Sequence, residues 1–176
     1  LARLDERSRL QGSLDWLKTI PVKELLQRGK IREQPEPLSL LEEILRFFGV
    51  ADVGAWREGW EKPQFAFRKS PAFKGQTGPM ATWLRLCELD AVAVRCKPFS
   101  RARFQAALRE IRSLTEAEPA EIVRAMQDQC AEAGVAVVLI PKIKGAPVSG
   151  AAKWLSPRKA MIGLNLRGKS NDRFWF

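Results

Sequence analysis

Histidine is absent from the 176-residue sequence. This absence excludes a Ser-His-Asp triad, a histidine general base and a histidine-ligated zinc site within these residues. Cysteine is scarce as well, with only Cys87, Cys96 and Cys130 and no C-x-x-C spacing, so neither a disulfide framework nor a thiolate metal site is predicted. Free thiols in a reducing cytoplasm are the better interpretation. No apolar run exceeds nine residues, about half of what a membrane-spanning helix needs, so no membrane association is predicted.

Acidic residues are outnumbered by basic ones, 20 to 30, and the formal net charge is +10. The excess is concentrated in residues 62–112 and 135–176, whereas acidic residues predominate in 31–61 and 113–134. A strongly basic surface favours anionic partners without naming one.

Aromatic residues are interleaved with cations in the first basic stretch, 62–112, where Phe65, Phe67, Phe73 and Trp83 occur. Its candidate nucleic-acid contacts are Arg68, Lys69, Lys74, Arg101 and Arg103. Basic side chains neutralise phosphates and aromatic rings stack on bases, so one interpretation is a nucleic-acid-binding module. The other is that these cations form the solvated face of amphipathic helices.

Start and stop signals divide residues 1–133 into short helices. Ser39 and Glu42 have the spacing of a capping box and predict a helix start. Gly49 is the predicted end of that helix. Asp52 is the predicted cap of a further short helix that carries Trp56 and Trp60.

The pattern changes after Gly134. Residues 135–140 are a β-branched run and predict a buried strand, and 148–155 is a second candidate. After a turn at 156–159, apolar residues alternate with other residues over 162–167, which is the period of a half-buried strand. The last two strands are predicted to form an antiparallel hairpin, and the fold class is α+β.

Four segments of the C-terminal part carry a family resemblance: 134–138 (GVAVV), 148–155 (VSGAAKWL), 164–167 (LNLR) and 171–176 (NDRFWF). Together they resemble the ImmA/IrrE family of zinc metallopeptidase-like proteins. The similarity is greatest to the branch in which an XRE-type helix-turn-helix precedes the peptidase-like domain, as in HigA-like antitoxins of toxin–antitoxin modules.

Three upstream segments, 16–25, 45–50 and 83–85, resemble the helical region that joins the two parts in that branch. The resemblance therefore implies a helical connecting region over 1–133. It implies a partial zincin-like domain over 134–176, made of its first three strands and an opening helical turn.

The resemblance also indicates what this chain lacks. In the family, the helix that begins with the run Phe174-Trp175-Phe176 carries a His-Glu-x-x-His motif that holds zinc and supplies a general base. Neither that motif nor the helix-turn-helix occurs here. We therefore expect an internal fragment with no catalysis, no metal ligands and no cofactor, and we expect zinc only in an intact parent protein.

The function implied is that of part of a DNA-binding transcriptional regulator of ImmA/IrrE type, the antitoxin of a toxin–antitoxin module. The alternatives are a fragment of an active zinc metalloendopeptidase that cleaves a repressor, and a basic nucleic-acid-binding module. The expected partners are a toxin or repressor protein, DNA through the parent's helix-turn-helix, and a second copy in a homodimer. Trp56 and Trp60 are candidate anchors of a protein interface.

One further candidate is a sheet edge that pairs with extended substrate. The residues are Gly150, Ala151, Ala152, Lys153 and Trp154. An exposed strand edge binds a peptide through main-chain hydrogen bonds. The alternative is that Trp154 only packs and that Gly150 relieves a bend.

Overall fold

The computed structural model describes residues 2–61, 66–69, 76–113 and 119–165. The chain forms two compact units. The first comprises Leu1–Gln64, Lys74–Trp83 and Ile143–Pro147, and the second comprises Phe65–Phe73, Leu84–Lys142 and Val148–Phe176. The run Phe174-Trp175-Phe176 and the expected opening helical turn lie outside the described residues.

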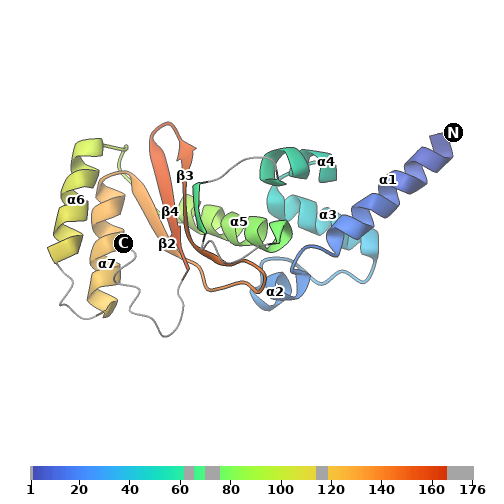
Figure 1. Cartoon of the computed structure of the whole chain (residues 1–176), viewed down its shortest axis with the longest axis horizontal. Helices are drawn as coiled ribbons and strands as arrows, with labels where there is room; N and C mark the ends of the chain where they lie inside the picture. Colours follow the sequence, from blue (N-terminus) through green and yellow to red (C-terminus); the bar gives the residue numbers. More distant parts are fainter. Residues whose placement is uncertain (1, 62–65, 70–75, 114–118, 166–176) are drawn as a thin grey trace. The chain divides into compact units, whose positions relative to one another are not determined.

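The first unit is helical over its described residues (Figure 1). Its elements are α1 (Ala2–Leu17), α2 (Val22–Gln27), α3 (Pro37–Phe48), α4 (Val53–Trp56), the π-helical segment η1 (Arg57–Glu61) and the beginning of α5 (Thr77–Ala93). Gly49 ends α3 with φ of 71°, a left-handed conformation that residues with a Cβ rarely adopt. Asp52 caps α4 as predicted, because its Oδ1 accepts the Ala55 amide at 2.8 Å.

The start of α3 differs from the prediction. The helix begins at Pro37, so Ser39 lies inside its first turn and the expected capping box does not form. Proline is well suited to this position because its φ is already helical and its missing N–H would have had no partner there.

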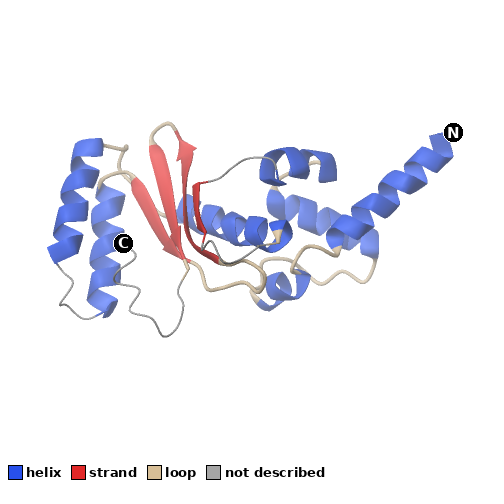
Figure 2. Cartoon of the chain, in the orientation of Figure 1, coloured by secondary structure: helices blue, strands red, loops and turns tan. Residues whose placement is uncertain are grey.

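Over its described residues, the second unit contains a four-stranded sheet and three helical segments, which Figure 2 shows in red and blue. Its elements are β1 (Ala66–Lys69), the remainder of α5, α6 (Arg101–Ser113), α7 (Pro119–Glu132), β2 (Val135–Leu139), β3 (Val148–Ser156) and β4 (Lys159–Leu164). The strand order is β1-β3-β4-β2, in which β2 pairs in parallel with β4 and the other pairs are antiparallel. The α+β class and the β3–β4 hairpin are therefore confirmed.

The strand β1 corrects the expectation that residues 1–133 are helical throughout. Its partner β3 lies some eighty residues later in the chain, with Ala66 opposite Ala152 and Arg68 opposite Gly150. A strand of four residues is too short to show a clear alternation, and the identity of a partner so far along the chain leaves no signal in the local sequence. The sheet therefore draws its strands from both sides of residue 134.

The helices α6 and α7 lie side by side, with α7 next to β2 (Figure 2). Buried residues from the two helices pack against one face of β2; they are Ala107, Ile111, Met126 and Cys130, against Val135 and Val137. Gly134 connects α7 to β2 with φ of 88°, and a Cβ there would lie 2.3 Å from the Phe99 Cα atom. This turn therefore requires glycine both for its dihedral angle and for the close approach of the loop before α6.

Candidate functional site

The proposed substrate edge over Gly150–Trp154 belongs to β3, which is an interior strand. On one side, Gly150, Ala151 and Ala152 pair with β1, and on the other side β3 pairs with β4 from Gly150 onward. The prediction of a free edge is therefore wrong for these three residues, because their main-chain groups already have partner strands. Gly150 lies close to its neighbour, since an added Cβ would be 3.0 Å from the Gly163 carbonyl oxygen.

The cations proposed to contact nucleic acid are not brought together as one set by the described residues. Arg68 and Lys69 lie on β1, whose backbone alone is described, and Lys74 lies outside the described residues. Arg101 and Arg103 occupy the first turn of α6, where both side chains are exposed. The Arg103 Nη2 donates a hydrogen bond of 2.8 Å to the Pro98 carbonyl oxygen.

The loop that leads into α6 lies against the tip of the β3–β4 hairpin. The amide of Phe99 donates to the carbonyl oxygen of Arg158 at 2.8 Å, and the Phe99 and Trp154 rings meet edge to face with centroids 4.8 Å apart. Trp154 is nevertheless 55% exposed. Two groups of candidates that the sequence kept apart, the α6 arginines and the residues at Trp154, thus belong to one surface.

Trp56 and Trp60 are 2% and 9% exposed, so the prediction that they anchor a protein interface is wrong. They form an aromatic cluster with Trp16 and Phe48, with ring centroids 5.2 to 6.4 Å apart. Aromatic rings in edge-to-face contact stabilise a core beyond the area that they bury. The role of these tryptophans is therefore to hold α1, α3, α4 and η1 together.

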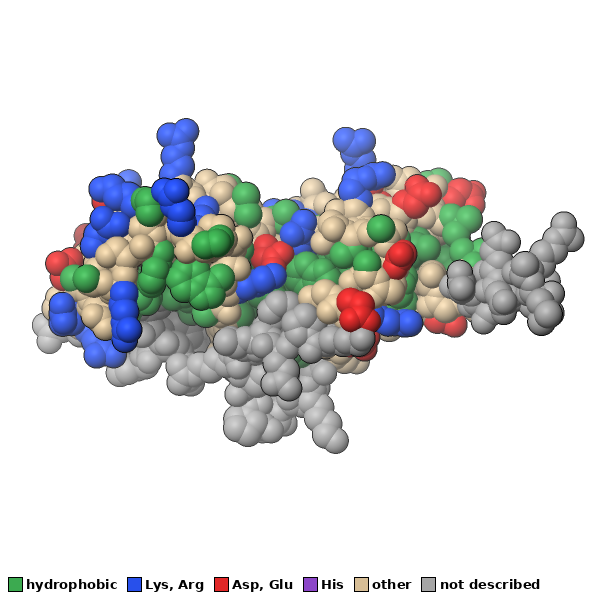
Figure 3. Space-filling view, turned by 90° about the horizontal axis from the view of Figure 1, so that it is seen from above, with side chains coloured by type: hydrophobic (Ala, Val, Ile, Leu, Met, Phe, Trp, Pro, Cys, Tyr) green, Lys and Arg blue, Asp and Glu red, His purple; other side chains and the backbone are tan. Residues whose placement is uncertain are grey.

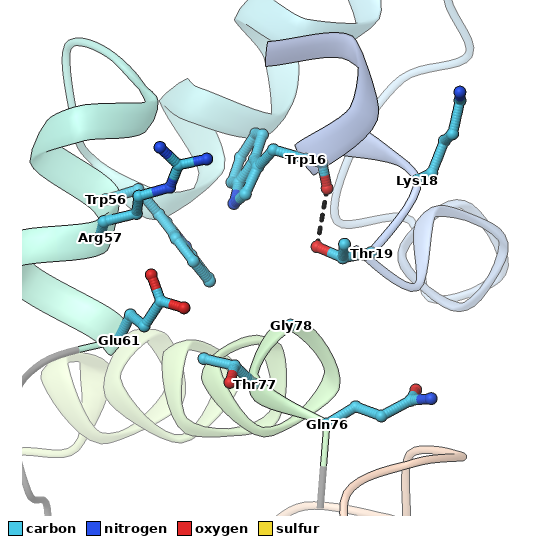
Figure 4. Close-up of a pocket in the computed structure, with 9 residues that line it drawn as sticks. All are labelled: Trp16, Lys18, Thr19, Trp56, Arg57, Glu61, Gln76, Thr77 and Gly78. Atoms are coloured by element: carbon cyan, nitrogen blue, oxygen red, sulfur yellow. Dashed lines mark hydrogen bonds between the residues drawn. The ribbon is translucent and has the colours of Figure 1, made fainter. Parts of the chain in front are cut away.

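A cavity of about 540 Å³ borders this cluster in the first unit (Figure 4). Trp16 and Trp56 form one wall, and Arg57 and Glu61 extend from η1 on the same side of the opening. The Thr19 hydroxyl donates to the Trp16 carbonyl oxygen at 2.7 Å, which fixes the turn after α1. The described lining contains no cysteine and only one carboxylate, that of Glu61, so it supplies neither a thiol nucleophile nor a carboxylate pair.

Comparison with known proteins adds no identification. No family model, no curated protein and no solved structure matches this chain.

The three cysteines have thiols that favour the protonated form. Burial raises the pKa of Cys130 to about 11. The pKa of Cys87 is raised by burial and also by the nearby Asp90 and Glu88 carboxylates. Burial also raises the pKa of Cys96, although the Lys159 ammonium opposes it. The flanking Arg95 and Lys97 therefore do not make Cys96 a reactive thiolate.

The residues do not fit the zinc ion that the family resemblance implies for a parent protein. The sequence has no histidine, and within the described ranges no group of three or more cysteine, aspartate or glutamate side chains could hold a metal. Within the same ranges, no helix combines the length and the apolar character needed to cross a membrane.

Proposed function

We propose that this chain is the connecting and partial peptidase-like portion of an ImmA/IrrE-type transcriptional regulator, the antitoxin of a toxin–antitoxin module. It acts in the cytoplasm by binding a protein partner and performs no catalysis itself. The finer attribution of the sheet to a zincin-like domain is part of this proposal.

The observation that supports it is the order of elements over the segments that carry the resemblance. Helix α7 leads into β2, and the antiparallel β3–β4 hairpin follows. That is the helix, strand and hairpin order expected from those segments. The zinc-dependent mechanism of the family needs two histidines on one helix, and these residues contain none, so the role proposed for them is binding.

A growth assay tests this function. The reading frame adjacent to the gene is expressed alone and then with residues 1–176 or with the full reading frame that contains them. We expect the adjacent product to arrest growth, and we expect co-expression to restore growth with both proteins recovered intact in one complex.

Two controls separate the alternatives. Rescue by residues 1–176, which contain no histidine, supports neutralisation by binding. A metalloendopeptidase is indicated instead if only the full reading frame restores growth, if a zinc chelator abolishes that rescue, and if the partner is recovered cleaved. Persistent growth arrest with both versions contradicts the antitoxin proposal.

A further inference from the structure

The surface at the tip of the β3–β4 hairpin combines an exposed aromatic ring with two segments that contain basic residues and no acidic ones. Residues 91–109 contain five lysines and arginines, residues 148–165 contain three, and neither segment has an aspartate or glutamate. The two segments meet where Phe99 contacts Trp154 and the Arg158 carbonyl oxygen. Figure 3 shows lysine and arginine side chains bordering hydrophobic ones over this part of the chain.

Three of these cations already have a carboxylate or a carbonyl partner within the protein. Lys97 pairs with Glu132 at 2.5 Å, Lys153 pairs with Glu88, and the Lys159 ammonium donates to the Val94 carbonyl oxygen at 2.6 Å.

Other cations on this surface have no acidic partner among the described residues. Three of them are Arg95, Arg101 and Arg158, whose side chains are all exposed. Arg103 is exposed as well, but its guanidinium already donates to the Pro98 carbonyl oxygen. Arg95 and Arg101 are within four residues of Phe99, and Arg158 is in the hairpin turn. Guanidinium groups left without a carboxylate are suited to phosphate oxygens, which they bind through paired N–H donors.

The aromatic part of the surface is open for stacking. Alternate residues of a strand share a face, so Ala152 and Trp154 point to the same side of β3, and both are exposed. Ala160 lies opposite Trp154 on β4 and is too small to cover an indole. The edge-to-face contact with Phe99 holds the Trp154 ring and leaves more than half of that residue exposed.

We propose that this surface, made of Trp154, Arg95, Arg101 and Arg158, binds single-stranded nucleic acid. The phosphates contact the arginines, and an unstacked base lies on Trp154. A single strand fits better than a duplex because the faces of duplex bases are already stacked. It also fits better than an acidic peptide, which supplies charge but no planar ring for the indole. This inference does not depend on the regulator proposal.

The test measures binding of a fluorescein-labelled (dT)20 oligonucleotide to the 176-residue protein by anisotropy between 20 and 200 mM salt. Three phosphate contacts on a single strand predict a slope of log affinity against log salt of about −2. The variant Trp154→Ala is expected to weaken binding roughly tenfold, and Trp154→Phe is expected to recover most of that loss because its ring still stacks.

A pair of double variants separates a built surface from general positive charge. Arg101→Ala with Arg158→Ala should weaken binding several-fold and reduce the magnitude of the salt slope by about 1.4, because two of the three phosphate contacts are removed. Arg109→Ala with Arg124→Ala removes the same charge from exposed positions further along α6 and on α7 and should have much less effect. Circular dichroism establishes that all variants remain folded.

Three results would each overturn the proposal. They are no binding at 20 mM salt, equal loss in the two double variants, or binding to polyglutamate or to duplex DNA that is as tight as to (dT)20. The measurements with duplex DNA and polyglutamate therefore also show whether the surface prefers another class of polyanion.

Discussion

Replacing Glu88 with glutamine tests how the second unit holds α5 against its sheet. Glu88 is 7% exposed, and its carboxylate lies between two cations. One oxygen accepts from the Arg85 guanidinium at 3.0 Å, and the other contacts the Lys153 ammonium on β3. The Glu88→Gln variant keeps the shape of the side chain, removes its charge and replaces one acceptor oxygen by an NH2 donor.

The expected cost follows from the exposure of the two partners. Removing one member of a fully buried ion pair costs about 3–5 kcal/mol because the other charge is left without compensation. Here the side chains of Arg85 and Lys153 are 23% and 33% exposed, so water compensates part of the loss. We therefore expect a loss of about 1–3 kcal/mol, which at ~2 kcal/mol lowers the melting temperature by roughly 4–8 °C for a chain of this size.

Thermal and urea unfolding followed by far-UV circular dichroism measure this loss. Glu110→Gln on the exposed surface of α6 is the matched control and should shift the melting temperature by about 1 °C or less. A double-mutant cycle with Lys153→Met isolates the pair and should give a coupling energy of about 1 kcal/mol or more. If Glu88→Gln unfolds as the control does, the ion pair does not secure α5 to β3.

Three further predictions concern the cores and the thiols. Trp56→Ala removes a ring from the aromatic cluster and should cost about 3–5 kcal/mol in urea unfolding; a loss below ~1 kcal/mol would mean that the cluster is not packed as described. Gly134→Ala forces a Cβ against Phe99 at a φ of 88° and should cost at least ~2 kcal/mol, whereas an unchanged unfolding midpoint would contradict the close approach. The pKa of Cys130 is raised from 9.0 to about 11, so between these pH values the folded state keeps a proton that the unfolded state releases. The contribution of Cys130 to the free energy of unfolding should therefore decline as the pH rises from 9 to 11. The free energy of unfolding of wild type minus that of Cys130→Ala should fall over this range, and a pH-independent difference would show that the thiol is not buried.

Local signals in the sequence were sufficient for the end of α3, the cap of α4 and the β3–β4 hairpin. Gly49 and Asp52 marked a helix end and a helix cap correctly because both effects involve neighbouring residues only. The alternation predicted over 162–167 overlaps β4 (Lys159–Leu164) in its last three residues, where Ile162 and Leu164 pack against the core that α6 and α7 share with β2. The start of α3 was missed because Ser39 satisfied a capping pattern while Pro37 offered a better first residue.

The remaining features depend on contacts between distant segments. β1 was missed because its strand pairing is with β3, and for the same reason β3 is interior and Gly150–Ala152 are not an edge. Trp56 looked like an interface anchor, but α1 and α3 bury it through Trp16 and Phe48. The contact of Trp154 with Phe99, two residues before Arg101, likewise joins distant segments, although the absence of acidic residues from both segments is visible in the sequence.

Sequencing the gene on both sides of these 176 codons tests the central claim most directly. The proposal that the chain is part of an ImmA/IrrE-type regulator predicts a helix-turn-helix encoded ahead of Leu1. It also predicts a helix shortly after Phe176 that carries His-Glu-x-x-His or a degenerate form of that motif. A reading frame that terminates immediately after Phe176, with no helix-turn-helix upstream, would contradict the account.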